Sequence, residues 1–164
     1  FNEGFFAYRK EGAEGTDFQR MLVQKPPIEK GRILATSGCV TSCIDLPDGL
    51  VKALNDNRGD SYGFAIRDSE IPVVMGDYRT GNMRIKYRHE MASYPAGDLE
   101  LLFTARKNKR DELEEKFQKA GLTIYWIGEV VPKAGVYVDI GKGDFVEPRV
   151  GVFVKHFKGK MLFR

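Results

Sequence analysis

The chain has 164 residues, a length typical of one domain that can bury a substantial hydrophobic core. Apolar residues make up 42% of the chain, and the formal net charge is +3 with both signs of charge mixed. This composition indicates a globular protein and argues against nucleic acid as a partner. Apolar runs such as Leu101–Phe103 are far too short to span a membrane, so we predict no membrane association.

Both ends of the sequence carry information about its context. The first residues, Phe1–Gly4, include no initiator methionine and do not open a signal peptide. We therefore expect a chain that is preceded by further residues, with a short helix within residues 1–20. The tail Lys155–Lys160 is interpreted as a solvated basic end, with attraction for phosphate as the alternative.

The first half of the chain predicts alternating helices and strands. Pro27 suits the first turn of a helix, and Ser37-Gly38 ends it. A β-rich segment then leads to an acidic turn and a second helix, and an alternating segment follows. The expected elements are a helix over Ile28–Thr36, a strand over Cys39–Ile44, a helix over Leu50–Asn55 and a strand over Tyr62–Ile66.

The second half begins with a poorly patterned stretch, Val73–Gly97, of a kind that often covers a ligand site or moves. A weak strand is expected there over Met83–Tyr87. Clearer signals follow, with Leu113 and Phe117 on the apolar stripe of a helix. The expected elements are a strand over Glu100–Thr104, a helix over Asn108–Ala120, strands over Thr123–Val131 and Val136–Ile140 that form an antiparallel hairpin, and a last strand over Val150–Val154.

This order of elements predicts a single α/β domain with a mixed, partly antiparallel sheet flanked by helices. Strands and helices are interspersed, and the last strands are close enough in sequence to pair as hairpins. The sequence contains no internal repeat and no second domain boundary.

An acidic turn joins the first predicted strand to the second predicted helix. Asp45 and Asp48 lie three residues apart, and Pro47 fixes φ between them. Carboxylates at such a junction can hold a hard cation such as Mg²⁺, and a helix N-terminus favours phosphate. The alternative is structural: Asp48 caps the helix and Asp45 ends the strand.

The two cysteines, Cys39 and Cys43, are four residues apart and would face the same side of a strand. With only His89 and His156 elsewhere, the chain lacks the ligands of a zinc site. We therefore expect a reduced pair of small buried side chains in a cytoplasmic protein.

Four motifs occur in a fixed order: Ile44–Leu50, Ile71-Pro72, Gly97–Thr104 and Ile127–Val130. Together they resemble the C-terminal domain of the thiamine-monophosphate kinase family, in the AIR synthase-related superfamily. That family shows D-x-S-D-G-L, then I-P, then G-E-D-Y-E-L-L-F-T, then I-G-E-V. The lead-in from Pro26 to Ala35 is also similar, so the resemblance covers roughly residues 25 to 157, with a diverged archaeal-type member as one interpretation.

The resemblance implies transfer of the γ-phosphoryl group of ATP to thiamine monophosphate, with Mg²⁺ and without a covalent phosphoenzyme. Asp45 and Asp48 would then be Mg²⁺ ligands beside the ATP phosphates, and Glu100 would contact the substrate. Asp98 would be structural or would support the site residues without touching the ligand, and Glu129 would be a feature of its strand. Phosphoryl transfer needs charge neutralisation and alignment more than side-chain chemistry, which suits carboxylates.

The chain departs from the family pattern at three positions. Pro47 stands where the family has a serine that helps to hold ATP, and Leu99 replaces a tyrosine. Val154 stands where the family often has an aromatic residue that stacks on the substrate. These changes leave open a paralogue with another acceptor.

The resemblance also implies an N-terminal domain that supplies most metal ligands, much of the ATP site and the homodimer interface. Nothing in the 164 residues resembles that domain, so we expect the chain alone to be catalytically silent. The alternative is a non-catalytic module that binds a nucleotide or a partner. A natural start codon directly before Phe1 would favour this alternative.

Overall fold

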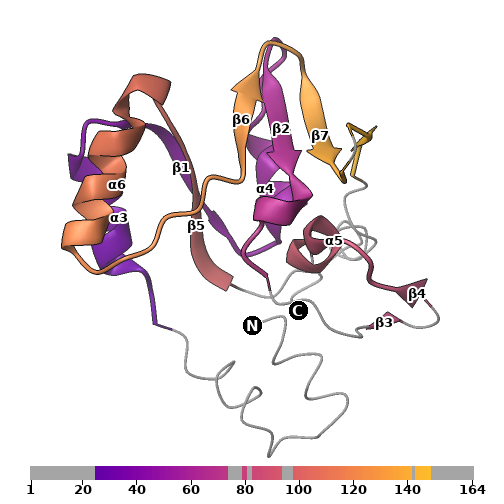
Figure 1. The fold of residues 1–164 in the computed structure, drawn as a ribbon, viewed down its shortest axis with the longest axis horizontal. Helices are drawn as coiled ribbons and strands as arrows, with labels where there is room; N and C mark the ends of the chain where they lie inside the picture. Colours follow the sequence, from indigo (N-terminus) through magenta and orange to yellow (C-terminus); the bar gives the residue numbers. More distant parts are fainter. Residues whose placement is uncertain (1–24, 74–78, 81–82, 94–97, 142, 149–164) are drawn as a thin grey trace, which may run out of the picture.

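The computed structural model describes residues 25–73, 79–80, 83–93, 98–141 and 143–148. The strand expected over residues 150–154 and the helix expected within residues 1–20 lie outside these ranges. The elements, shown in Figure 1, are α3 (Ile28–Thr36), β1 (Val40–Leu46), α4 (Leu50–Asn57), β2 (Gly63–Arg67), the 3₁₀ turn η1 (Asp68–Glu70), β3 (Arg79–Thr80), β4 (Met83–Arg84), α5 (Arg88–Ala92), β5 (Asp98–Ala105), the 3₁₀ turn η2 (Lys107–Lys109), α6 (Arg110–Lys119), β6 (Gly128–Val131), β7 (Gly135–Asp139) and β8 (Phe145–Val146).

The described strands form a mixed arrangement of sheets. β1 pairs with β5 in antiparallel orientation, and a second sheet has the order β6-β2-β7-β8. Within that sheet β2 is antiparallel to β6 and parallel to β7, while the short strands β3 and β4 pair separately. The predicted α/β class, with a mixed and partly antiparallel sheet, is confirmed.

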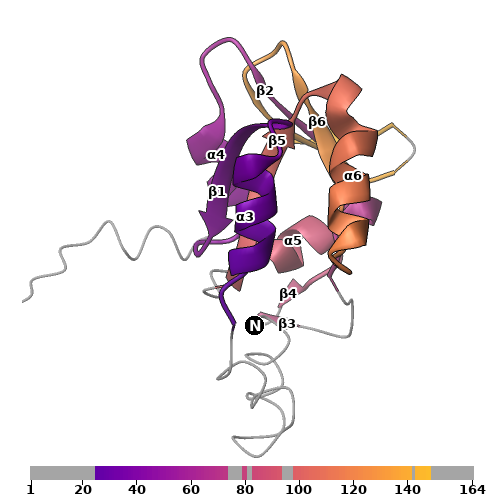
Figure 2. The ribbon, with the colours of Figure 1, turned by 90° about the vertical axis from the view of Figure 1, so that its left-hand side faces the viewer.

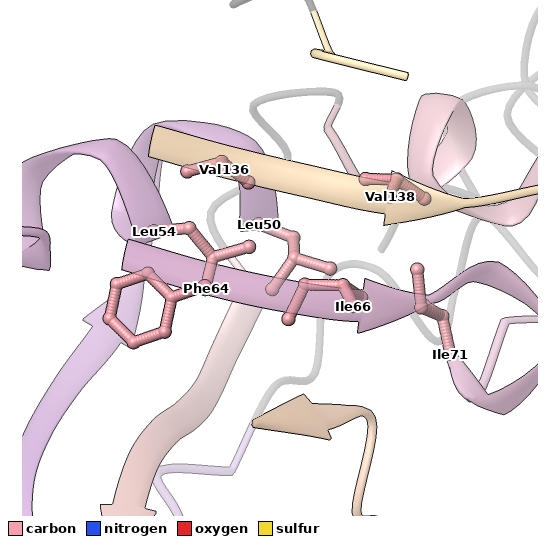
Figure 3. Close-up of a cluster of buried hydrophobic side chains, with 7 residues drawn as sticks. All are labelled: Leu50, Leu54, Phe64, Ile66, Ile71, Val136 and Val138. Carbon is pink, nitrogen blue, oxygen red and sulfur yellow. The ribbon is translucent and has the colours of Figure 1, made fainter. Parts of the chain in front are cut away.

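One hydrophobic cluster joins α4 to the four-stranded sheet. Figure 3 shows side chains of α4 packed against side chains of β2 and β7. Leu46 of β1 and Leu102 of β5 pack against the same cluster. Its buried members are Leu50, Leu54, Phe64, Ile66, Ile71, Val136 and Val138.

A second cluster joins α3 and α6 to the β1–β5 pair. Both helices lie over this pair in Figures 1 and 2. Leu101 and Phe103 of β5 pack against this cluster, whereas Leu102 between them packs against the first one. Alternate side chains of β5 therefore bury themselves on opposite faces, because neighbouring residues of a strand point to opposite sides. The buried members of this cluster are Leu34, Cys39, Leu113 and Phe117.

The hairpin expected from Thr123–Val131 and Val136–Ile140 is wrong. β6 and β7 are separated by β2, which pairs with both of them. The chain reverses direction after Val131, as expected. The strand that follows, β7, does not pair with β6, because β2 from much earlier in the sequence lies between them. Short connections favour pairing of neighbours, and here the β2 strand takes the place between them.

The strand expected from Thr123 is confirmed only from Gly128 onward. Residues 122–127 carry no strand pairing, although Ile124 and Trp126 pack on the second cluster and Ile127 on the first. The side chains thus alternate as in a strand, although the segment forms no strand ladder; at its end, the carbonyl oxygen of Ile127 accepts a backbone hydrogen bond from Arg67 of β2 (2.8 Å). β5 is likewise paired on one side only, with β1.

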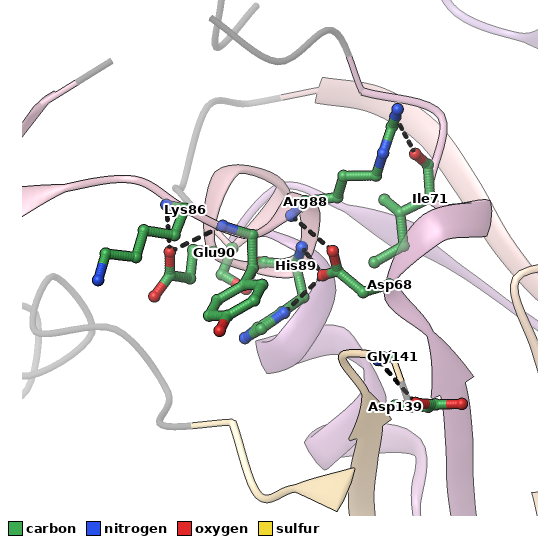
Figure 4. Close-up of polar contacts among 10 residues, drawn as sticks. Asp68, Ile71, Lys86, Arg88, His89, Glu90, Asp139 and Gly141 are labelled. Carbon is green, nitrogen blue, oxygen red and sulfur yellow. Dashed lines mark hydrogen bonds and ion pairs between the residues drawn. The ribbon is translucent and has the colours of Figure 1, made fainter. Parts of the chain in front are cut away.

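The weak strand expected over Met83–Tyr87 is confirmed only at its first two residues, and residues 85–87 belong to no helix or strand. Only Met83 and Arg84 are in a strand, and α5 begins at Arg88. Figure 4 shows what holds this short helix: Asp68 accepts hydrogen bonds from the backbone N–H groups of Arg88 (3.1 Å) and His89 (2.8 Å) and from His89 Nδ1 (2.6 Å). Glu90 within α5 also accepts hydrogen bonds from the backbone N–H groups of Lys86 (2.8 Å) and Tyr87 (3.1 Å). Asp68, in contrast, lies about twenty residues upstream, so local sequence does not reveal its contribution.

Candidate functional site

The acidic turn follows directly from the end of β1. The N–H of Gly49 donates a hydrogen bond to the carbonyl oxygen of Leu46 (3.3 Å), which closes a turn whose corner residues are Pro47 and Asp48. Both corner residues are exposed, and so is Asp45 on β1. Proline at the first corner position is preorganised for such a turn, because its ring fixes φ.

The N-cap of α4 is Gly49 and not Asp48, so the capping interpretation of Asp48 is wrong. Gly49 has a φ of +85° and a ψ of 165°, and α4 has no side-chain cap hydrogen bond. The Asp48 carboxylate is therefore not used by the helix that follows it. This leaves its oxygen atoms available for another role.

Gly49 also brings α5 against the turn. A Cβ atom at Gly49 would lie 2.7 Å from the backbone C and O atoms of Ser93, at the C-terminal end of α5. Only glycine allows this approach. Arg88 fixes the other end of α5, since its Nη1 donates to the carbonyl oxygens of Ile71 (3.0 Å) and Val73 (2.6 Å).

The register of β1 and β5 brings the predicted metal ligands and the predicted substrate residue to one end of the sheet. Asp45 lies opposite Leu101, the neighbour of Glu100. Glu100 is exposed, and Lys30 Nζ of α3 donates to its Oε2 (2.9 Å) and Oε1 (3.3 Å). Residues more than fifty positions apart in the sequence therefore lie at the same end of the β1–β5 pair.

A cavity of about 1090 Å³ lies between the two sheets. Lys30 and Glu100 line it near the acidic turn, and Gly49 contributes from the turn itself. Asp45, Pro47 and Asp48 lie outside its lining. The rest of its wall comes mainly from three sources. They are residues 101–107, in β5 and directly after it, residues 121–130, and apolar side chains of the first cluster.

The donor chemistry of the turn suits Mg²⁺. Asp45 and Asp48 offer exposed carboxylate oxygens, and a protein site for Mg²⁺ commonly uses one or two carboxylates together with water and substrate phosphates. Within the described ranges, no group of three or more His, Cys, Asp or Glu side chains could hold a metal ion. Any further protein ligands would come from other parts of the protein.

The two cysteines do not form the expected buried pair. Cys39 is fully buried in the second cluster, whereas Cys43 is exposed on β1. Cys39 precedes the strand, and the pairing with β5 shifts between Val40 and Ser42, so strict alternation does not extend from one cysteine to the other. Partial burial, and then the Asp45 carboxylate, raise the pKa of the Cys43 thiol.

The remaining motif residues have structural positions. Gly128 pairs with Ile66 in β6, and a Cβ there would lie 2.2 Å from the carbonyl oxygen of Ala65. The interpretation of Glu129 as a feature of its strand agrees with its place in β6. Asp98 begins β5, and Val154 lies outside the described residues.

Sequence reasoning missed two contacts in this region. The Asp68–His89 pair was not expected, nor was the contact of Lys30 with Glu100. Neither has a local signal, because the partners are distant in the sequence. In the parts of the chain that the structure describes, no helix is both long and apolar enough to cross a lipid bilayer.

Comparisons with known proteins rest on structure alone. No family model matches the chain, and no curated protein matches its sequence. Among solved structures, it is similar to thiamine-monophosphate kinase from Stenotrophomonas maltophilia, with 21% identity and a TM-score of 0.62 over 84% of this chain. The protein tt0281 from Thermus thermophilus matches 90% of the chain with 21% identity and a TM-score of 0.59.

A third similar structure is E. coli HypE, a hydrogenase maturation protein, with 13% identity and a TM-score of 0.59 over 92% of this chain. The chain spans 46% or 47% of the length of each of these three proteins. At these identities the comparisons concern the fold. The chain therefore shares the fold of a part that makes up nearly half of this thiamine-monophosphate kinase and of HypE.

Proposed function

We propose that the chain is the C-terminal domain of a Mg²⁺- and ATP-dependent phosphotransferase that converts thiamine monophosphate to thiamine diphosphate. The observation that carries this proposal is the juxtaposition of two separate motifs. The register of β1 and β5 sets Asp45 opposite the neighbour of Glu100, on a fold similar to that of a thiamine-monophosphate kinase. Metal ligands and an acceptor-binding carboxylate would thereby share one end of the sheet.

In this proposal Asp45 and Asp48 hold Mg²⁺ beside the ATP phosphates, and Glu100 binds the acceptor. The metal would supply neutralisation of phosphate charge, which phosphoryl transfer requires. Pro47 has neither a side-chain hydroxyl nor a backbone N–H, so it cannot donate a hydrogen bond to the nucleotide at this corner of the turn. Binding of ATP therefore depends on other groups, and Val154 would lie near the acceptor.

The active unit is proposed to be the full-length protein, a cytoplasmic homodimer whose N-terminal domain completes the ATP site. The chain alone is then silent. The reading frame upstream of Phe1 provides a direct check, since it should encode an acid-rich domain. A start codon immediately before Phe1 contradicts this proposal and favours a non-catalytic binding module.

The decisive assay incubates the full-length protein with Mg-ATP and thiamine monophosphate and measures thiamine diphosphate. Asp45→Asn is expected to lower kcat by roughly 100-fold or more, because a metal ion contributes several kcal/mol of charge stabilisation in the transition state. Asp56→Asn is a matched control, since Asp56 is an exposed carboxylate at the other end of α4. Thermal unfolding checks that both variants fold.

If Asp45→Asn is as active as the parent, the metal role of Asp45 is wrong. If the parent turns over ATP with another acceptor and makes no thiamine diphosphate, the acceptor assignment is wrong. That second outcome favours a paralogue, a candidate supported by the similarity to HypE and by the departures at Pro47 and Leu99.

A further inference from the structure

A charged pair from two different elements lies at the edge of the cavity. Lys30 of α3 contacts both carboxylate oxygens of Glu100 on β5, at 2.9 Å and 3.3 Å. The Lys30 side chain is 31% exposed and that of Glu100 is 61% exposed. Ion pairs this accessible contribute little to stability, so both groups can exchange partners at small cost.

The backbone of α3 holds Lys30 at this place. A Cβ at the next residue, Gly31, would lie 3.7 Å from Leu101 Cδ1, so α3 packs closely over β5 beside Glu100. Leu101 is in turn the residue opposite Asp45. The Lys30 ammonium group and the Glu100 carboxylate thus lie side by side on the wall of the cavity, which Gly49 of the acidic turn also lines.

We propose that Lys30 and Glu100 together select an acceptor that carries both a cationic ring and a phosphate group, an inference that rests on the proposed function. In the free protein each group neutralises the other. When the acceptor binds, Glu100 exchanges the Lys30 ammonium for the ring cation, and Lys30 binds the acceptor phosphate. One internal ion pair is replaced by two ion pairs with the ligand.

This exchange gives discrimination against acceptors that carry only one of the two charges. A cationic acceptor without phosphate would bind to the Glu100 carboxylate and leave the Lys30 ammonium group without a partner. An anionic acceptor without a cation would bind to the Lys30 ammonium group and leave the Glu100 carboxylate without a partner. Sites reject ligands strongly when binding leaves one of their own charged groups without a partner.

The test uses the full-length protein and measures dissociation constants for thiamine monophosphate and for thiamine by calorimetry. Lys30→Met is expected to reduce the preference for thiamine monophosphate by roughly tenfold, the loss typical of one hydrogen bond between charged groups. Lys30→Arg should keep most of the preference. Lys119→Met is the matched control, because it removes the cation of the exposed Lys119–Glu115 pair on α6 and should change neither constant.

The exchanged double variant, Lys30→Glu with Glu100→Lys, separates recognition from structure. It restores an ion pair, so a purely structural pair would regain the preference, whereas recognition by each group at its own position predicts that the preference stays lost. Because the exposed pair contributes little to stability, the thermal midpoint should stay close to that of the parent and serves as the check of folding. An unchanged preference in Lys30→Met, or its recovery in the exchanged variant, overturns this inference while the proposed function stands. A parent protein that neither binds thiamine monophosphate nor makes thiamine diphosphate overturns both.

Discussion

Asp45 sits beside the Cys43 thiol on the exposed face of β1, and the two residues affect each other. The pKa of Cys43 is raised by partial burial and, to a smaller extent, by the Asp45 carboxylate. A raised pKa keeps the thiol protonated at neutral pH and lowers its reactivity, since the thiolate is the nucleophile. Cys39 is fully buried and shielded from reagents. Cys43 is therefore a reporter of the charge at position 45.

Asp45→Asn is expected to lower the pKa of Cys43 part of the way toward its ordinary value, because burial remains after the carboxylate is gone. At a fixed pH below that pKa, alkylation by iodoacetamide should then be faster. The measurement is the rate of Cys43 alkylation as a function of pH, followed by mass spectrometry. Asp48→Asn should leave the midpoint unchanged, and an unchanged midpoint in Asp45→Asn would show that its carboxylate does not act on the thiol.

At the scale of single residues, local chemistry could be predicted and long-range contacts could not. The turn at Asp45–Gly49 follows from proline, aspartate and glycine in sequence, and the structure places it there. The nearness of Asp45 to Glu100 depends on a strand register with a shift between Asp45 and Leu46. No local rule sets that register, since it reflects packing of both strands on two helices.

At the scale of helices and strands, the junction of β1, α4 and α5 also combines features that the sequence predicts with features that depend on distant residues. The starts of α3 and α4 agree with the sequence prediction, and Leu34 of α3 and Leu50 and Leu54 of α4 are buried in the clusters. The sequence does not predict α5, because this helix has only five residues and depends on Asp68 and on the approach of Gly49, which lie outside its own sequence, as well as on the local cap made by Glu90. Short helices have little stability of their own and form through tertiary contacts.

Gly49→Ala is expected to destabilise the domain by about 3 kcal/mol or more. The φ and ψ of Gly49 lie in a region that is nearly restricted to glycine, and the added Cβ would meet the Ser93 backbone at 2.7 Å. Gly38→Ala is the comparison: it also has a positive φ (+68°), but a Cβ there meets no atom within 4 Å. Its cost should be about 1 kcal/mol.

Denaturant unfolding of the two variants measures the difference between them. Equal losses of stability would contradict close packing of α5 against the turn, because both variants would then report backbone strain alone. A larger loss in Gly49→Ala, accompanied by faster proteolysis near α5, is the result expected from the structure.

At the scale of the whole molecule, the described strands fall into sheets that meet across the cavity. β5 is paired on one side by β1, and its other edge faces residues 121–130 across the cavity. β2, in contrast, is paired on both sides. The amide groups of these two strands should therefore differ in their access to water, although both strands contribute side chains to hydrophobic clusters.

Hydrogen exchange is expected to divide the amides of β5 into two classes. Those bonded to β1 should be protected, and those on the cavity side should exchange as at a free sheet edge. The amides of β2, Gly63–Arg67, should be protected throughout. Residue-resolved exchange measured by NMR tests this pattern, and uniform protection along β5 would show that the strand is paired on both sides in solution.

The α/β class and most segments could be predicted from the sequence, because hydrophobic periodicity reflects which faces are buried. The order of strands could not. Tyr125 and Trp126 carry strong strand propensity, yet they belong to no strand, and the pairing with β2 begins only at Gly128. Propensity describes a side chain on a pleated surface, and which strand lies beside it is decided by the packing of the whole chain.

The position of β2 between β6 and β7 has a consequence for how the chain folds. Ile66 pairs with Gly128, and Gly63 pairs with Gly135, so both β6 and β7 pair with a strand from a distant part of the sequence. In the described part of this sheet, only β7 and β8 pair as a local antiparallel hairpin, and β6 and β7 cannot form one with each other. The entropy of closing a long loop must be overcome before the contacts with β2 form, and such topologies fold slowly. The same arrangement makes β6 and β7 depend on β2, because loss of β2 would leave them without their shared neighbour.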